Sequence, residues 1–299
     1  QSPTVVGGLG RDFDTCRSVT GCGRGRHRGI SRGHAASVVA EGIPLGRGQL
    51  CFTGRCDVGK ERESRRRLGR IDVAHAADAG ANLQPSDIIT TTGAMEAIYL
   101  SLAATTQPGD RVLVQSPTYF GILQAIEVYG LKAVEVPSHP RTGIDLPALH
   151  DALKATAIRA IVTMPTAANP LGSIMPDDAK AALYALAVRH DVPIIEDDVY
   201  GELCFDGARP RPIKAWDKDG RVLLCGSVSK TLAPGYRVGW IAPGRYQDDI
   251  ERLKFSQSLA CPTLTGMAVA EMLSSGSYDR HLRRLRHVVA GQVARYRDE

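Results

Sequence analysis

The residues best suited to covalent chemistry lie in the segment Ser227–Lys230, which contains two serines and a lysine, and Arg237 follows it. Two hydroxyls, an ammonium and a guanidinium can together bind a phosphate dianion. The lysine amine could then attack an aldehyde, and burial beside Arg237 would favour the neutral form that this attack needs. A surface lysine without a role is the plainer alternative, and the serine and apolar neighbours argue against it. The segment therefore predicts a phosphate site next to a nucleophilic Lys230.

Three acids, Glu196, Asp197 and Asp198, directly follow the apolar run Val192–Ile195. A carboxylate in such a place is costly unless it meets a cation or a hydrogen-bond donor. A protonated pyridine nitrogen would be a suitable partner. Because a solvent-facing acidic loop accounts for two of the acids, we assign the pairing role to Asp197 and a structural role to the other two.

Three further positions each allow a functional and a plainer interpretation. Gly93, Ala94 and Met95 lie where a strand meets a helix, so free N–H groups could bind an anion there, although tight packing explains the glycine as well. Tyr119 could stack on a flat heterocycle, but packing is the commoner reason for such a ring. Asn169 could present its amide to a ligand or satisfy its own turn.

All of these residues follow predicted strands. The sequence predicts strands over 88–92, 111–115, 132–136, 160–164, 193–196, 222–225 and 238–242. It predicts helices that end near 81, then over 94–105, 119–129, 146–155 and 177–190, and an amphipathic region over 245–299 with a break at Pro262. This alternation predicts an α/β fold with a doubly wound, mostly parallel sheet. Ligands bind such sheets outside the carboxyl ends of the strands, so the residues named above should meet at one edge.

Composition restricts the class of protein. The chain has 299 residues and is 43% hydrophobic, which is enough for a sizeable core. No apolar run approaches the roughly 20 residues that a membrane helix needs, and no signal-peptide pattern opens the chain, so we expect a cytoplasmic protein that does not contact a membrane. Seven cysteines without tight spacing argue against a disulfide framework.

The basic surplus is confined to the first quarter of the chain. Residues 1–70 hold 14 Lys and Arg against six acids, whereas the remaining residues hold 23 against 26. Residues 1–70 also carry 14 of the 31 glycines and show no sustained periodicity. We therefore leave residues 1–74 unassigned and expect a disordered tail in preference to a nucleic-acid-binding arm.

We also consider two other origins for this segment. An Arg-, Gly- and Cys-rich passage that ends abruptly in patterned sequence is typical of out-of-frame translation of a GC-rich gene, and we favour this hypothesis. A zinc site is the weaker idea, because the spacings from Cys16 to Cys22 and from Cys51 to Cys56 fit the usual zinc pattern poorly. No metal is therefore expected.

The later part of the chain, from about residue 75, resembles the large domain of fold-type I enzymes that depend on pyridoxal 5′-phosphate (PLP), the class I/II aminotransferases. The segments that carry the resemblance are Ser116–Gly121, Asn169–Pro176, Glu196–Gly201 and Ser227–Trp240. They are most similar to the aminotransferase-like domain of GntR/MocR-type transcriptional regulators. The resemblance implies a PLP-binding large domain over 75–275 and a helix over 276–299 that leads to a small C-terminal domain, itself truncated.

The resemblance assigns five residues to the ring of the cofactor. Lys230 would form the Schiff base with PLP and shuttle a proton, and Asp197 would keep the pyridine nitrogen protonated. Asn169 and Tyr200 would hydrogen-bond the phenolic oxygen, and Tyr119 would stack on the ring. Lys230, Asp197 and Tyr200 are therefore the expected catalytic residues.

The resemblance assigns five other residues to the phosphate. The amides of Ala94 and Met95 would bind it together with the side chains of Ser227, Ser229 and Arg237. The family often has a hydroxyl and an amide side chain where Ala94 and Met95 stand, so this grip would depend on the backbone more than usual.

Three functions follow from the resemblance. The first is an aminotransferase that moves an amino group between an amino acid and a 2-oxo acid. The second is the PLP-binding effector domain of a GntR/MocR-type regulator, which would bind DNA only if a helix-turn-helix domain was lost upstream. The third is an inactive remnant, whose missing small domain would leave the substrate site open to water. No candidate can be named for the arginine that, in the family, clamps the substrate carboxylate. The resemblance also implies a homodimer.

Overall fold

The computed structural model describes residues 43–45, 49–51 and 80–298. The chain divides into two units, Gln1–Arg55 and Cys56–Glu299. In the first, Ile43–Leu45 (β1) pairs antiparallel with Gln49–Cys51 (β2). The other predictions made for residues 1–79, among them the tail, the basic arm and most of the zinc ligands, lie outside the described residues.

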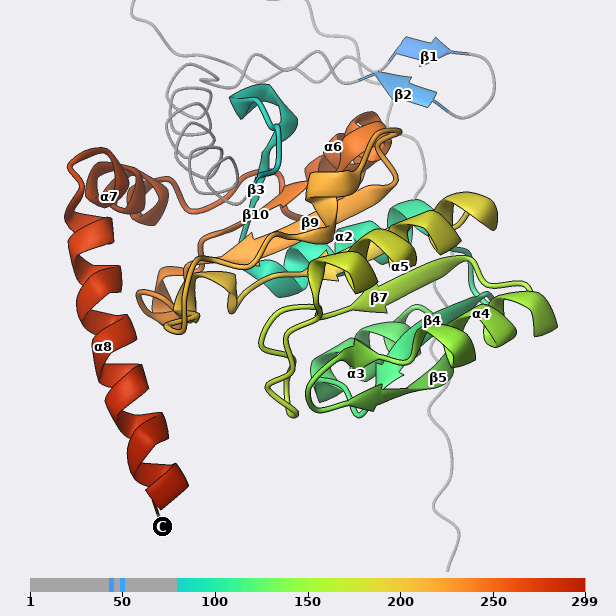
Figure 1. The fold of residues 1–299 in the computed structure, drawn as a ribbon. Helices are drawn as coiled ribbons and strands as arrows, with labels where there is room; N and C mark the ends of the chain where they lie inside the picture. Colours follow the sequence, from blue (N-terminus) through green and yellow to red (C-terminus); the bar gives the residue numbers. More distant parts are fainter. Residues whose placement is uncertain (1–42, 46–48, 52–79, 299) are drawn as a thin grey trace, which may run out of the picture. The chain divides into compact units, whose positions relative to one another are not determined.

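The second unit contains an eight-stranded sheet in the order β3-β10-β9-β8-β7-β4-β5-β6 (Figure 1). Its strands are β3 (Ile89–Thr91), β4 (Arg111–Ser116), β5 (Lys132–His139), β6 (Gly143–Ile144), β7 (Ala160–Thr163), β8 (Ile194–Asp197), β9 (Val222–Ser227) and β10 (Gly239–Ala242). The five central strands from β9 to β5 are parallel. β10 runs antiparallel to β3 and β9, and β6 runs antiparallel to β5. The predicted mostly parallel sheet is confirmed.

Helices follow most of the strands. The α-helices are α2 (Ala94–Thr105), α3 (Phe120–Val128), α4 (Leu146–Ala155), α5 (Asp177–Arg189), α6 (Gln247–Ser258), α7 (Thr263–Ser274) and α8 (Ser277–Asp298). Short 3-10 helices are η1 (Pro85–Asp87), η2 (Gly201–Leu203), η3 (Ile213–Trp216), η4 (Pro234–Tyr236) and η5 (Gly244–Tyr246). Among these helices, none has the length and apolar character that a membrane span requires.

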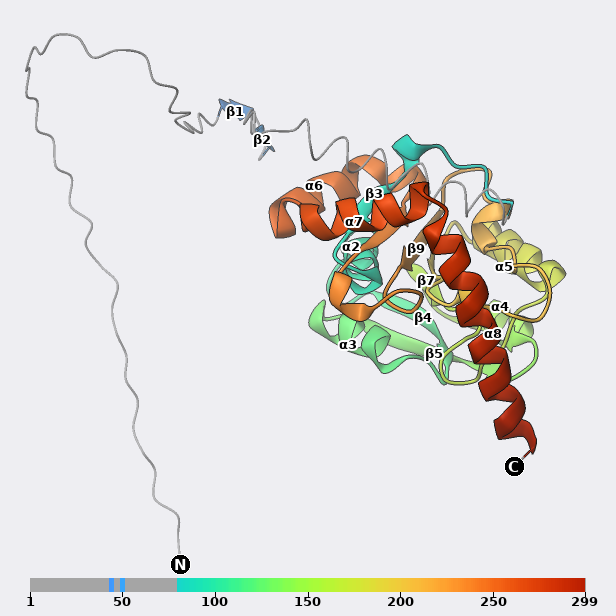
Figure 2. The same ribbon diagram turned by 90° about the vertical axis from the view of Figure 1, so that its left-hand side faces the viewer.

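The sheet buries both of its faces. On β4, Val112 and Val114 pack into a core with α2, α3 and α6, while Leu113 points the other way into a core with α4 and α5. This alternation follows from the two-residue period of a strand. Figure 2 shows the same layers turned by 90°. The doubly wound arrangement predicted from the apolar runs is therefore confirmed, and it leaves only the strand ends for function.

The C-terminal amphipathic region has one more break than the sequence analysis predicted. Pro262 caps α7 as expected. A second break lies at Gly276, whose φ of +67° is the left-handed conformation that ends α7 and lets α8 begin. The region therefore forms three helices, and α8 packs against α7 and η2.

Candidate active site

The strand register brings three separate segments to one edge of the sheet. Gly239, the first residue of β10, pairs with Thr91 at the end of β3 and with Ser227 at the end of β9. Asp197, the last residue of β8, pairs with Cys225, two residues before Ser227. The start of α2, the serine and lysine segment, and the acid therefore lie at the same edge, as predicted.

The predicted phosphate cradle is built from glycine and arginine. Gly93 has a φ of +108° and caps α2 without a side-chain hydrogen bond. Arg237 lies against it, donating from Nη2 to the Thr92 carbonyl at 2.5 Å. A Cβ on Gly93 would lie 2.5 Å from that same Nη2 and would displace the guanidinium, and the φ of +108° favours glycine in any case. The guanidinium therefore lies beside the residue that precedes the first N–H groups of α2, those of Ala94 and Met95, and both features favour an anion.

The serines continue this cradle. Ser227 is the last residue of β9, and its hydroxyl accepts a hydrogen bond from the Ser229 N–H at 3.4 Å. Both serines are half-buried. Arg237 has a left-handed backbone with a φ of +51°, which is a strained conformation for a residue with a side chain. The register between β9 and β10 thus places the serines and Arg237, which the sequence analysis expects to bind a phosphate, at the same edge of the sheet.

Asp197 is almost fully buried, at 3% exposure. Its Oδ1 accepts a hydrogen bond from the Val199 N–H at 3.3 Å. Burial raises the pKa of Asp197 to about 7, while that N–H and the charge of Lys230 act in the opposite direction. A buried acid whose ionised form is so costly is a suitable partner for a bound cation.

Lys230 lies near this acid and near Tyr200. Its Nζ is 5.7 Å from the centroid of the Tyr200 ring, and its charge acts on Asp197. Lys230 itself is exposed, so the prediction that it is buried beside Arg237 is wrong. The reason is geometric, because Lys230 belongs to a turn beyond the end of β9 and its long side chain reaches out over the edge of the sheet. Exposure of the amine leaves it accessible to a ligand that arrives at this edge.

Tyr119 and Asn169 flank the point where the strand order reverses. The chain runs outward from β4 to β5 and then returns to β7 on the other side of β4. Tyr119 follows β4 and packs over Gly121 and against Phe120, with ring centroids 4.7 Å apart. Asn169 follows β7 and donates its backbone N–H to the Met164 sulfur. Both residues are half-buried at the predicted edge, and Tyr119 also packs against the core formed with α2 and α3.

Comparison with known proteins agrees with this geometry. Residues 70–297 match the family described as Aminotransferase class I and II. The chain belongs to this family. The resemblance inferred from the sequence is therefore confirmed.

Two kinds of family member are similar to the chain. The HTH-type transcriptional regulator YjiR of Escherichia coli (strain K12) is 45% identical over 79% of this chain and 49% of its own length. Aromatic-amino-acid aminotransferase 1 of Thermococcus litoralis is 35% identical over 66% of this chain and 48% of its own length. The chain therefore spans about half the length of the curated relatives it matches.

Solved structures of aminotransferases share the fold. The multiple substrate aminotransferase of Thermococcus profundus superimposes with a TM-score of 0.69 at 28% identity, covering 76% of this chain and 57% of that one. The kynurenine aminotransferase of Pyrococcus horikoshii gives a TM-score of 0.68 at 30% identity, covering 75% and 56%. The likeness lies in the described α/β unit.

The two neighbours of Asp197 are not on a solvent-facing loop, contrary to the sequence analysis. Glu196 is 0% exposed and accepts hydrogen bonds from the N–H groups of Ile213 and Lys214 at 2.7 and 3.0 Å. Asp198 is 5% exposed and pairs with Arg209 at 2.5 Å. Burial raises the pKa of both carboxyls. Glu196 and Asp198 therefore have structural contacts, as expected, but these contacts lie in the protein interior and not on a solvent-facing loop.

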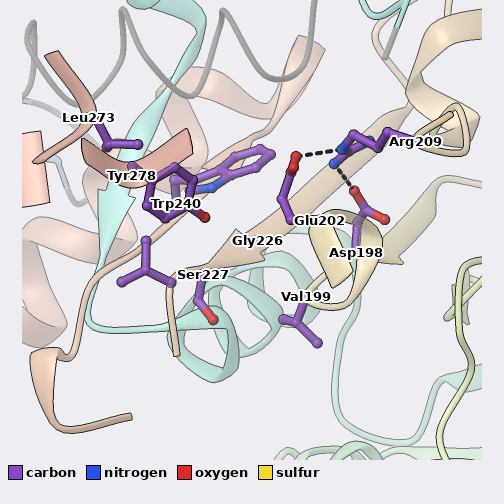
Figure 3. Close-up of a pocket in the computed structure, with 10 residues that line it drawn as sticks. Asp198, Val199, Glu202, Arg209, Gly226, Ser227, Trp240, Leu273 and Tyr278 are labelled. Carbon is purple, nitrogen blue, oxygen red and sulfur yellow. Dashed lines mark hydrogen bonds and ion pairs between the residues drawn. The ribbon is translucent and has the colours of Figure 1, made fainter. Parts of the chain in front are cut away.

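Arg209 was missed by the sequence analysis. It also pairs with Glu202 at 2.5 Å, so one guanidinium bridges two loop carboxylates (Figure 3). Figure 3 shows this bridge beside a cavity of about 30 Å³ that Ser227, Trp240 and Tyr278 also line. No signal in the sequence distinguishes Arg209 from other arginines. Its partners lie 11 and 7 residues earlier in the same connection between β8 and β9, and no repeating element sets this spacing.

Proposed function

We propose that this chain binds PLP through Lys230 and, as a class I and II aminotransferase, transfers an amino group between an amino acid and a 2-oxo acid. One observation carries the proposal: a buried acid, an accessible lysine and a positive cradle lie at one edge of a parallel sheet. The residues fit the cofactor, because PLP combines a phosphate with a basic ring nitrogen. When bound, PLP supplies an aldehyde and an electron-accepting ring for amino transfer.

The residues of the chain would divide this work. The Asp197 carboxylate would hold a proton on the ring nitrogen, and the cradle formed by Gly93, the α2 amides, the serines and Arg237 would bind the phosphate. Lys230 Nζ would anchor the cofactor and then move the substrate proton. Tyr119, Asn169 and Tyr200 would orient the ring, and residues 75–275 would form the cofactor-binding domain.

Absorbance and covalent trapping test the anchor. Purified protein incubated with PLP is expected to give a visible band, and borohydride is expected to fix the cofactor on Lys230, as read by peptide mass spectrometry. Lys230→Ala should abolish both signals, because it removes the only amine assigned to the aldehyde. Lys218→Ala is the matched control, since Lys218 is exposed before β9, at the opposite edge of the sheet. Trapping on other lysines with Lys230 unmodified would reject the proposal.

The phosphate cradle has its own test. Arg237→Met should weaken PLP binding by roughly tenfold or more, because a charge-assisted contact contributes about 1.5–3 kcal/mol. Binding of pyridoxal, which lacks the phosphate, should be unchanged. Equal losses for both ligands would show that Arg237 acts only on the fold of the loop.

A second function is favoured by the similarity to HTH-type transcriptional regulators. In that case the chain would be the effector domain of a regulator, and bound PLP would react with a ligand in order to sense it, without converting the ligand to a product. Amino acids added to the PLP-loaded protein distinguish the two. Conversion to pyridoxamine phosphate, reversed by a 2-oxo acid, supports the aminotransferase, whereas a spectral change without release of a 2-oxo acid supports the effector domain.

We further propose that the chain forms a homodimer through α6 and α7. The family resemblance implies a dimer. Four large apolar side chains are exposed on these two helices and in the turn between them, namely Phe255, Leu259, Leu264 and Met267. Leu264, at 84% exposure, is the most suitable to change. Leu264→Arg should shift the sedimentation coefficient from dimer to monomer, whereas Val128→Arg on α3 should not. A monomeric wild-type protein would refute this assignment.

A further inference from the structure

Thr231, the residue directly after Lys230, is held from two sides by helix α8. The Tyr278 hydroxyl donates to Thr231 Oγ1 at 2.8 Å, and His281 Nε2 lies 2.7 Å from the Thr231 carbonyl oxygen. Because a carbonyl can only accept, His281 must carry a hydrogen on Nε2. Tyr278 and His281 are three residues apart and therefore lie on one face of α8. Both the side chain and the backbone of Thr231 are thus fixed by the same helix.

The contact continues into the turn that contains Lys230. Thr231 Oγ1 donates to the Val228 carbonyl at 3.4 Å, and the Leu232 N–H donates to the same carbonyl at 2.8 Å. The Val228 N–H in turn donates to the Val238 carbonyl at 3.1 Å. Lys230 therefore lies in a turn that is hydrogen-bonded to Val238, just before β10, on one side and to α8 on the other.

The Tyr278 hydroxyl is not needed for packing. Tyr278 is 4% exposed, and its ring fills an apolar cluster with Val228, Val238, Leu273 and Leu282. Figure 3 shows the ring beside Trp240, above Ser227. Phenylalanine would fill this space equally well. The hydroxyl donates its hydrogen bond to the residue next to the lysine.

The same helix also holds the loop of Tyr200. Arg286 on α8 donates from Nε to the Glu202 carbonyl at 2.6 Å and pairs through Nη2 with the Glu202 carboxylate at 3.0 Å. Glu202 lies two residues after Tyr200, whose ring is near the Lys230 amine. The helix α8 thus fixes both loops that approach the lysine.

We propose that Tyr278 and His281 are positioning residues for Lys230, which they hold in place by clamping Thr231. The proposal rests on the proposed function, because it assigns the clamp to the lysine that anchors PLP. A lysine side chain has many rotamers, so a fixed backbone reduces the entropy lost when the amine meets the aldehyde. Loss of the clamp should weaken the lysine–cofactor bond without altering the phosphate cradle.

Two ligands separate this effect from general loss of structure. PLP reports the whole site, and 4′-deoxypyridoxine 5′-phosphate, which lacks the aldehyde, reports the cradle and the ring contacts alone. Tyr278→Phe should weaken PLP binding about threefold to tenfold, the effect of one buried hydrogen bond, and leave binding of the deoxy ligand unchanged. In a Lys230→Ala background, Tyr278→Phe should have no effect on either ligand. Tyr296→Phe, on an exposed part of the same helix, is the matched control.

Variants that keep the hydrogen-bonding group should retain PLP binding, whereas variants that remove it should not. Thr231→Val removes the hydroxyl at nearly constant volume and should reproduce Tyr278→Phe, whereas Thr231→Ser should bind PLP like the wild type. His281→Gln keeps a donor near Nε2 and should bind better than His281→Ala. Thermal unfolding of each cofactor-free variant checks that the fold persists.

The outcomes distinguish the clamp from the function on which it rests. Parallel losses for PLP and the deoxy ligand, or an effect that persists in the Lys230→Ala background, would overturn the clamp while leaving the function standing. If wild-type binding of PLP does not depend on Lys230, the proposed function itself fails.

Discussion

Because Asp197 is buried, we predict that replacing its carboxylate will stabilise the cofactor-free protein but weaken the binding of PLP. Asp197→Asn keeps the shape of the side chain and an oxygen for the Val199 N–H, but it removes the charge. In the cofactor-free protein the variant should be more stable than the wild type. In the presence of PLP it should bind the cofactor less well, since an amide cannot hold a proton on the ring nitrogen.

The magnitude follows from the pKa. Burial raises the pKa of Asp197 from 3.8 to about 7, which is about three decades in the acid dissociation constant at about 1.4 kcal/mol each. Below pH ~4 the carboxyl is protonated in both states and carries no cost. Between pH ~4 and ~7 only the unfolded chain ionises freely, so folding loses stability as the pH rises. The cost should reach about 2 kcal/mol at pH 5 and about 4 kcal/mol at pH 8.

Urea denaturation of the cofactor-free proteins at pH 5 and pH 8 provides the assay. The difference in unfolding free energy between Asp197→Asn and wild type should be positive at both pH values and larger by ~2–3 kcal/mol at pH 8. Asp206→Asn, on an exposed turn, should stay within about 0.5 kcal/mol of the wild type at both. A variant that is less stable than wild type at pH 8 would refute the reasoning, because it would mean that the carboxylate is compensated in the folded chain.

Two further predictions concern neighbouring contacts. Gly93→Ala should destabilise the protein by about 1 kcal/mol more than Gly109→Ala. Both glycines have a positive φ, but only the Cβ at 93 would displace the Arg237 guanidinium from the Thr92 carbonyl. Thermal unfolding measures the difference, and equal effects would exclude this displacement. Arg209→Met should cost about 3–5 kcal/mol, because it removes the guanidinium that pairs with the buried Asp198 carboxylate and leaves Glu202 paired with Arg286. Arg252→Met, which breaks an exposed ion pair on α6, should cost less than about 1 kcal/mol in the same assay. Similar losses for the two variants would show that the Arg209 pairs are no stronger than surface ones.

The sheet and the strand-end residues could be predicted because their signals are local. Runs such as 112–114 and 160–162 are apolar throughout, as expected of buried parallel strands, and the polar residues that follow each run lie toward the carboxyl edge of the sheet. Asp197, Ser227 and Asn169 were found in this way. The second helix break could also have been found, because Gly276 follows two serines and precedes another, which is a pattern typical of one helix ending and the next beginning.

What could not be predicted depends on contacts between distant segments. The side chains of Glu196 and Asp198 are buried because η3 and Arg209 return over them, and nothing in the acidic run specifies that return. Thr231 looks like an ordinary turn residue until α8, about 50 positions later, places a tyrosine and a histidine on it. Such contacts are set by packing and leave no period or spacing in the sequence.

The distribution of unfavourable features supports the location of the site independently of any motif. Asp198 is buried as deeply as Asp197, yet Arg209 compensates its charge directly, whereas Asp197 meets a backbone N–H and a more distant lysine. Arg237 adopts a left-handed backbone conformation, which is more favourable for glycine than for a residue with a side chain. Folding alone would favour a neutral side chain at 197 and a relaxed one at 237. Both costs fall at the same edge of the sheet, and this supports the proposal that a ligand with a phosphate and a protonated ring nitrogen compensates them when it binds there.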